Sequence, residues 1–182
     1  MNDAGNPGDG QGREASSENA TPVAAPSPAP AKWLMIATYA AGAVGIFLGF
    51  WGLGSTPPSL TWAALLAVGV SGVLSWVRHS IFHASDAARM GWGIGRRNNF
   101  QIEVGLANLA WGLVAILAVA LRWGLRAEAA SLLVFGFYLG AVSIMLVATP
   151  SRDRTRPWGQ VVAMGAYAVT LLWLGFAGMS AA

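Results

Sequence analysis

Five long apolar runs without charged side chains constrain this chain more than any other feature of its sequence. Each run is about 18 to 21 residues long and holds no Asp, Glu, Lys, Arg, His or Pro. A helix of that length crosses the roughly 30 Å of hydrocarbon in a bilayer. The runs do not alternate apolar with polar residues, as the strands of a membrane barrel do. The sequence therefore predicts an all-α polytopic membrane bundle with five transmembrane helices, at about residues 33–53, 60–77, 104–121, 129–148 and 161–178.

The composition agrees with this fold and excludes several classes of function. The chain is 55% hydrophobic and 10% charged, whereas soluble domains carry about 25% charged residues. It has no cysteine, which excludes disulfides, thiolate metal sites and thiol catalysis. Its eleven Lys and Arg residues lie in loops beside the apolar runs and form no single patch. We therefore expect the lipid bilayer as a partner and no nucleic acid.

The first 32 residues differ in composition from everything that follows. They are rich in Gly, Pro, Ala, Ser and Asn, and they end in the run Pro26-Ser27-Pro28-Ala29-Pro30. Such a segment buries too little apolar surface to offset the entropy lost on folding. The sequence therefore predicts a disordered cytoplasmic tail over residues 1–32 and a five-helix domain over residues 33–179.

The basic residues also predict an orientation. Nine of the eleven lie on the side of the membrane that holds the N-terminus, and only Arg122 and Arg126 lie on the other side. Cytoplasmic loops are enriched in Lys and Arg. We therefore expect the N-terminus inside and the C-terminus outside. The nine residues are Arg13, Lys32, Arg78, Arg89, Arg96, Arg97, Arg152, Arg154 and Arg156.

Small residues recur at every fourth position in two of the runs. Gly45 and Gly49 continue such a stripe in the first run, and Gly136 and Gly140 form one in the fourth. Stripes of this kind let membrane helices approach closely. Two interpretations are open, packing within the bundle or a homodimer formed through one of these faces.

Two histidines follow the second run. His79 and His83 are four residues apart, so on a continuing helix they share a face, and Asp86 falls near it. Such a set could hold zinc, iron or a haem. The alternatives are interfacial histidines bonded to headgroups or loop carbonyls, and a pH-responsive pair. Apart from a metal or haem at this site, the sequence predicts no cofactor. Further on, Ser85 to Gly91 has the caps of a short surface helix, with an ordinary loop as the alternative.

Polar residues at the start of the third run form a second candidate cluster with these histidines. Gln101, Glu103 and Asn108 lie where that run enters the membrane. An ionisable residue there is costly and usually paired, so Glu103 is expected to pair with an arginine or histidine, or to handle a proton or ligand. Asn108 needs a hydrogen-bond partner, most simply on a neighbouring helix.

The same segment resembles a bacterial family of small integral membrane proteins of unknown function. The positions that carry the resemblance are His79, Gly91, Trp92, Phe100, Gln101, Glu103, Val104, Gly105, Ala107, Asn108 and Leu109. Asn98 and Asn99 stand where that family has Ser-Pro, which changes the geometry of the turn. The resemblance implies a multi-pass protein of the bacterial inner membrane and singles out this segment, but it implies no activity.

Three classes of function fit these features. The first is a binding or accessory protein that engages a membrane partner or small ligand through the polar cluster between the second and third spans. The second is a small oligomeric transporter or channel, although no run contains the buried charge that ion-coupled transport typically uses. The third is a metal- or haem-dependent membrane enzyme. The sequence favours the first class.

Overall fold

The structure, a computed structural model, describes residues 26–91, 99–148 and 158–182, and every regular element in these ranges is helical. Five spans are long and apolar enough to cross a membrane. The second of them consists of three consecutive segments, two π-helices with an α-helix between them. The all-α, five-span bundle predicted from the sequence is therefore confirmed. The elements are α1 (Ala29–Leu53), η1 (Ala63–Val70), α2 (Ser71–Trp76), η2 (Val77–Ile81), α3 (His83–Met90), α4 (Asn99–Ala120), α5 (Leu125–Ala148) and α6 (Trp158–Ala181).

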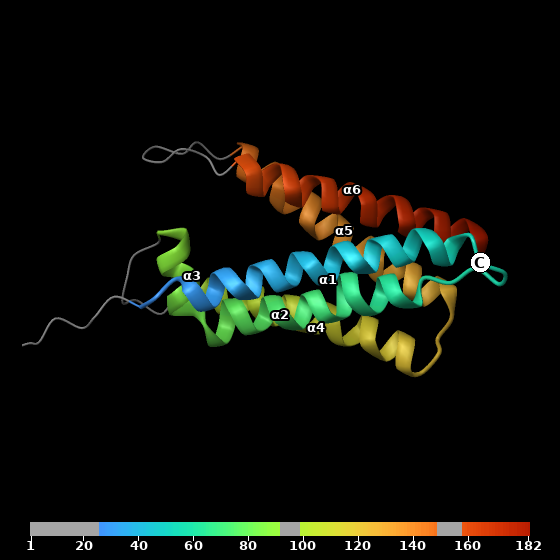
Figure 1. Cartoon of the computed structure of the whole chain (residues 1–182), viewed down its shortest axis with the longest axis horizontal. Coiled ribbons are helices and arrows are strands. Elements are labelled where there is room, and N and C mark those ends of the chain that lie inside the picture. Colours follow the sequence, from blue (N-terminus) through green and yellow to red (C-terminus); the bar gives the residue numbers. More distant parts are fainter. Residues whose placement is uncertain (1–25, 92–98, 149–157) are drawn as a thin grey trace, which may run out of the picture.

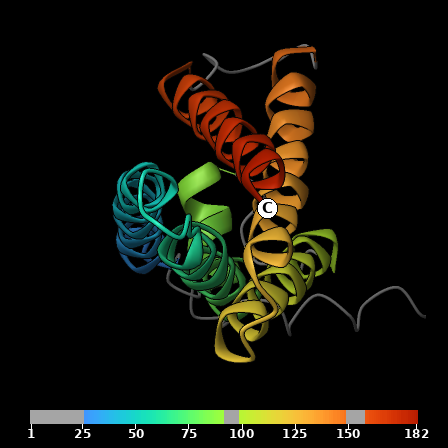
Figure 2. The same ribbon diagram turned by 90° about the vertical axis from the view of Figure 1, so that its right-hand side faces the viewer.

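Successive spans alternate in direction, so the bundle has two distinct ends (Figure 1). The short helix α3 lies at one end, together with the starts of α1, α4 and α6. We call this the α3 end. The C-terminus and the turn between α4 and α5 lie at the other, the C-terminal end (Figure 1). The helices α5 and α6 form an antiparallel pair that leans away from α1 toward the α3 end (Figures 1 and 2).

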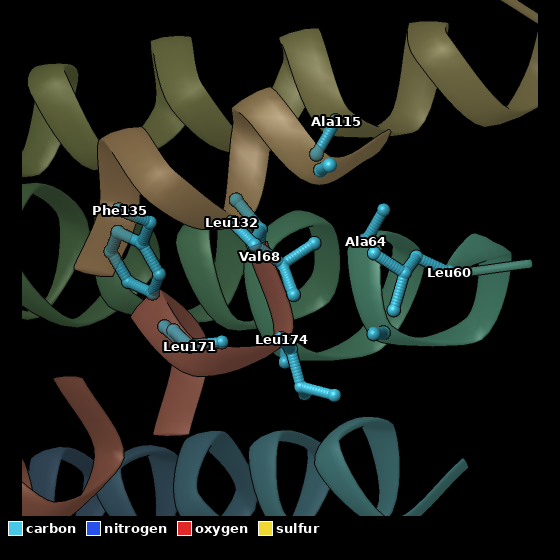
Figure 3. Close-up of a cluster of buried hydrophobic side chains, with 11 residues drawn as sticks. Leu60, Ala64, Val68, Ala115, Leu132, Phe135, Leu171 and Leu174 are labelled. Carbon is cyan, nitrogen blue, oxygen red and sulfur yellow. The ribbon is translucent and has the colours of Figure 1, made fainter. Parts of the chain in front are cut away.

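The apolar core joins the second span to α4, α5 and α6 (Figure 3). Its largest fully buried side chains are Leu60, Val68, Leu132, Leu171 and Leu174. Lipid is as apolar as these side chains, so burial from water does not drive their association within a bilayer. Close van der Waals packing therefore holds the helices together.

Glycines allow the second span and α4 to pack backbone against backbone. A Cβ atom on Gly112 of α4 would lie 2.9 Å from the carbonyl oxygen of Gly69, and one on Gly72 would lie 2.6 Å from that of Asn108. Side chains at either position would force the two helices apart. This crossing places the first turns of α4 beside η2, where the polar residues gather.

The first helix begins earlier than the apolar run from which it was predicted. It starts at Ala29, inside the segment expected to be disordered, and Pro30 lies in its first turn. Proline suits that position because the first amides of a helix have no partner within it. The disorder expected for residues 1–25 concerns residues outside the described ranges.

Candidate functional site

The polar side chains at the α3 end converge on one buried carboxylate, Asp86. It lies in the first turn of α3, and its side chain is 0% exposed. Four side chains from three helical segments surround it, Arg78 and His79 from η2, Arg89 from α3 and Gln101 from α4. We call these five residues the Asp86 network. It ties the end of the second span to the short helix and to the start of the third span.

Arg89 holds one oxygen of the carboxylate with two nitrogens. Its Nε and Nη2 atoms lie 3.0 and 2.9 Å from Oδ1 of Asp86. The two residues are three apart on α3, so they lie on the same face of that helix. Nε of Arg78 is 3.9 Å from the same oxygen, too far for a hydrogen bond. Arg89 is therefore the close counterion and Arg78 the distant one.

The other oxygen of Asp86 is held by His79 and Gln101. Nδ1 of His79 and Nε2 of Gln101 lie 2.8 and 3.0 Å from Oδ2. The Gln101 amide also donates to the backbone carbonyl of His83, at 3.3 Å. One side chain of α4 thus bonds both the carboxylate and the backbone of α3, and this positions the short helix.

The contacts of His79 assign its tautomer. Nη2 of Arg78 lies 2.8 Å from Nε2 of His79. A guanidinium carries only donors, so Nε2 must offer a lone pair. The proton of the neutral ring therefore lies on Nδ1, which is 2.8 Å from Oδ2 of Asp86. In this arrangement a neutral imidazole lies between the guanidinium of Arg78 and the carboxylate of Asp86, and it adds no positive charge.

The surroundings of Asp86 favour its ionised form. Burial alone would raise the pKa of the carboxyl group, but the hydrogen bond from His79, the charge of that ring when it is protonated, and the charges of Arg78 and Arg89 outweigh burial. Together they hold the pKa at about 2, below its ordinary value of 3.8. Asp86 is therefore an anion throughout the physiological range of pH.

The π-helical geometry of η2 explains how two adjacent residues reach one carboxylate. A π-helix closes its hydrogen bonds at i+5, as the 2.9 Å bond from the amide of Phe82 to the carbonyl of Val77 does. The wider turn reduces the angle between neighbouring side chains, so Arg78 and His79 both face α3. Such segments are frequent at functional sites.

A further contact fixes α3 against the first span. The hydroxyl of Ser85 accepts a hydrogen bond from the buried amide of Ala31, at 3.1 Å. The short helix expected from the sequence is present, and it ends at Gly91, whose φ of 64° is the left-handed conformation that glycine favours. The expected cap was wrong, because the helix begins at His83 with Phe82 as its N-cap. Ser85 bonds α1 instead.

Of the three predicted metal ligands, only two lie together. His79 contacts Asp86, whereas Nδ1 of His83 lies 3.2 Å from the backbone oxygen of Ser80. Among the described residues, no three His, Asp or Glu side chains form a group that could hold a metal ion. Metal or haem binding by His79, His83 and Asp86 stays a prediction, and their arrangement does not favour it.

The predicted cluster at the start of α4 divides between two faces of that helix. Gln101 and Asn108 are buried, while Glu103 is exposed and makes no hydrogen bond or ion pair with any residue that the structure describes. Asn108 donates to the carbonyl of Val104 in its own helix, at 2.7 Å. The structure therefore brings Gln101 to Asp86 and leaves Glu103 outside the network.

The predicted packing glycines face neighbouring helices of the same chain. A Cβ atom on Gly45 would lie 2.6 Å from the amide of Ala67, and one on Gly49 would lie 2.9 Å from Ala63. One on Gly136 would lie 3.0 Å from Leu172 of α6. Gly140 has more room, since its nearest neighbour, in Ala168, would be 3.9 Å away. This geometry suits packing within one bundle rather than a dimer through the same faces.

A second buried carboxylate, Glu128, was missed by the sequence analysis. It lies in the first turn of α5, at the C-terminal end, and is 7% exposed. Its oxygens accept hydrogen bonds from the amide of Leu60, at 3.0 Å, and the hydroxyl of Thr61, at 2.7 Å. Glu128 therefore anchors the start of the second span. The reasoning that singled out Glu103, an acid at the start of an apolar run, applies equally to Glu128 and could have found it.

Comparison with known proteins places most of the chain in one family. Residues 34–174 match the profile of a family of unknown function, DUF6790. No curated protein and no solved structure matches the chain. The matched range includes all five residues of the Asp86 network, and the match agrees with the expectation of a family without an assigned activity.

Proposed function

The chain belongs to DUF6790, a family of unknown function, and we propose that it is a binding or accessory protein of the membrane whose binding site is the Asp86 network. The observation that carries the proposal is the convergence of four polar side chains on one fully buried carboxylate at the α3 end. This is the largest set of contacting ionisable side chains in the part of the chain that the structure describes.

Stability alone is a poor reason for such a network. Removing charges from water is costly, and buried ion pairs are often replaceable by apolar residues without loss of stability. The bundle has an apolar core that already joins four of its spans. Ionisable side chains within membrane spans typically serve a function, and Arg78 and His79 lie in the second span. The π-helical turn that presents these two residues supports the same interpretation.

The proposal includes the topology expected from the basic residues. The N-terminus and the α3 end would face the cytoplasm of a bacterial cell, with residues 1–32 as a tail and residues 33–179 as the bundle in the inner membrane. The absence of cysteine from the chain allows a direct test with single cysteines. A cysteine replacing Ala127 should react with an impermeant thiol reagent in intact cells, and one replacing Ser151 should be shielded. The reverse pattern would overturn this orientation.

The function is tested by what the protein retains when it is extracted from native membranes. Wild type and the variants Asp86→Asn, Arg89→Gln and Glu103→Gln are purified in a mild detergent, and bound proteins and small molecules are identified by mass spectrometry. We expect a stoichiometric ligand or partner on wild type and on Glu103→Gln, and its loss from the two network variants. Glu103→Gln is the matched control, because it removes a charge at the same end outside the network.

Two outcomes would overturn the proposal. The same bound molecules on all four proteins would mean that the network is structural. Stoichiometric metal or haem that the network variants retain would favour the enzyme instead. Ion flux in proteoliposomes that these variants do not change would favour the transporter.

A further inference from the structure

The Asp86 network carries more positive than negative charge. Two guanidinium groups, of Arg78 and Arg89, face one carboxylate, and His79 is neutral in the arrangement of its contacts. Two positive charges less one negative charge leave a surplus of one positive charge. Glu103, an acid at the same end, is exposed and makes no ion pair with the described residues. The surplus therefore has no partner among the residues that the structure describes.

The surplus charge belongs to Arg78. Arg89 is bonded to Asp86 through two nitrogens, whereas Arg78 donates only to the neutral ring of His79. Nε of Arg78 is buried and forms no hydrogen bond with the described parts of the chain, and the nearer carboxylate oxygen of Asp86 is 3.9 Å away from it. A buried charged donor without an acceptor costs free energy. An anion that accepts from Arg78 would remove that cost.

The guanidinium of Arg78 is largely buried, with 14% of its side chain exposed. Tyr39 of α1 and Tyr138 of α5 lie within electrostatic range of this charge. Tyrosine hydroxyls can donate hydrogen bonds to an oxyanion. An anion bound beside Arg78 would meet one full positive charge, and these two hydroxyls are candidates for further donors.

The level of the site in the membrane indicates the kind of anion. Arg78 lies within the last four residues of the second span, which ends at Ile81, so in a bilayer it would lie near the level at which the hydrocarbon meets the headgroup phosphates. Large apolar side chains are exposed at the same end, among them Trp33, Phe82 and Phe100, at 68%, 40% and 65%. They would contact the acyl chains of a bound lipid. The fork of a guanidinium matches two oxygens of a phosphate group.

From these contacts we propose that Arg78, supported by Arg89, binds a phosphate-bearing anion at the α3 end, either the headgroup of an acidic phospholipid or a free phosphate ester. The proposal rests on the proposed function and names the class of ligand that the Asp86 network takes. Asp86 orients Arg89 and His79, and Arg78 makes the contact with the phosphate.

The test is a ligand titration of the purified full chain in a neutral detergent, with the melting temperature as the readout. The added probes are phosphatidylglycerol, phosphatidylcholine and inorganic phosphate. We expect phosphatidylglycerol to raise the melting temperature saturably and phosphatidylcholine to do so less. Arg78→Gln should lower the apparent affinity for phosphatidylglycerol about tenfold, as the loss of one charge-assisted hydrogen bond predicts.

The matched control is Lys32→Gln, which removes the same charge from an exposed position at the same end. It should change the affinity by less than about twofold, because exposed charges contribute little. Arg78→Lys provides a second variant in case Arg78→Gln does not fold. It keeps the charge and loses the planar fork, and it should bind more weakly than wild type.

The outcomes distinguish the source of the phosphate and separate this proposal from the preceding one. Competition by inorganic phosphate would support a free phosphate ester, and its absence would support the lipid. Equal binding by wild type, Arg78→Gln and Lys32→Gln would overturn the phosphate site. Capture of a partner without phosphate, lost from Asp86→Asn but not from Arg78→Gln, would overturn it while leaving the binding function intact. If Arg78 makes no difference to phosphate binding and no partner depends on Asp86, both proposals are rejected.

Discussion

The coupling between Asp86 and Arg89 is the most direct test of the network. In Asp86→Asn the side chain keeps its shape, but only one of its two terminal atoms can accept hydrogen bonds. Four nitrogens, two from Arg89 and one each from His79 and Gln101, lie 2.8 to 3.0 Å from the carboxylate oxygens in the native structure. Whichever way the new side-chain amide turns, its NH₂ group faces two donors, and the guanidinium of Arg89 loses its counterion.

The magnitude follows from the bonds that are lost. Hydrogen bonds to charged groups contribute about 1.5 to 3 kcal/mol each, and removing one partner of a buried ion pair costs about 3 to 5 kcal/mol. Because Arg89 is 15% exposed, water can relieve part of this cost, and we expect Asp86→Asn to lower the free energy of unfolding by about 3 kcal/mol. Arg89→Gln should cost less in the Asp86→Asn background than in wild type, with a coupling energy of about 1.5 kcal/mol or more.

The assay is a double-mutant cycle on protein purified in detergent. Unfolding of wild type, both single variants and the double variant is followed by circular dichroism against denaturant. Glu103→Gln provides the control and should leave the free energy of unfolding within about 0.5 kcal/mol of wild type. A coupling energy below about 0.5 kcal/mol would refute the reasoning, because residues in contact in one buried ion pair should not be additive.

Three further predictions concern pH, packing and the other buried carboxylate. The pKa of Asp86 is lowered from 3.8 to about 2, so the ionised carboxylate stabilises the folded protein fully above about pH 4 and loses this effect as the pH falls to about 2. The difference in melting temperature between wild type and Asp86→Asn should shrink over that interval. Gly112→Ala should lower the free energy of unfolding by about 1 to 3 kcal/mol, since its Cβ would lie 2.9 Å from a carbonyl oxygen, whereas Gly140→Ala, with 3.9 Å of room, should not lower it. Glu128→Gln should lower it by about 1 to 2 kcal/mol in denaturant unfolding, because an amide accepts only one of the two bonds that now include the amide of Leu60; wild-type stability would show that the bond at the C-terminal end is dispensable.

The fold could be predicted because one physical requirement dominates it. A backbone in hydrocarbon must satisfy its own hydrogen bonds, so each long uncharged run becomes a helix. The runs therefore revealed the five spans without any knowledge of tertiary contacts. Their ends were less certain, as Ala29 shows, because proline is compatible with the first turn of a helix as well as with a disordered tail.

The site was predicted only in part, and helix geometry explains where the prediction failed. Glu103 was grouped with Gln101 because the two are close in sequence, yet residues two apart on a helix lie on nearly opposite faces. Gln101, Gly105 and Asn108 follow the spacing of a single face, and all three are buried. That spacing alone would have excluded Glu103. The place of Asp86 at the centre could not be read in the same way, because it depends on the π-helical turn of η2, for which the sequence has no clear signal.

The two π-helical segments give the second span more residues per turn at these places than an α-helix would have. If part of η2 changed from π-helical to α-helical hydrogen bonding, the residues of that turn would shift by one position relative to the neighbouring helices. One residue of register corresponds to a rotation of about 100° and a translation of about 1.5 Å in an α-helix. A rotation of that size would carry His79 away from Asp86 and turn the guanidinium of Arg78 toward a different neighbour. Glu128 bonds the start of the second span, and Asp86 contacts His79 at its other end. Together the two carboxylates fix the register of the span and so the arrangement of side chains at the α3 end.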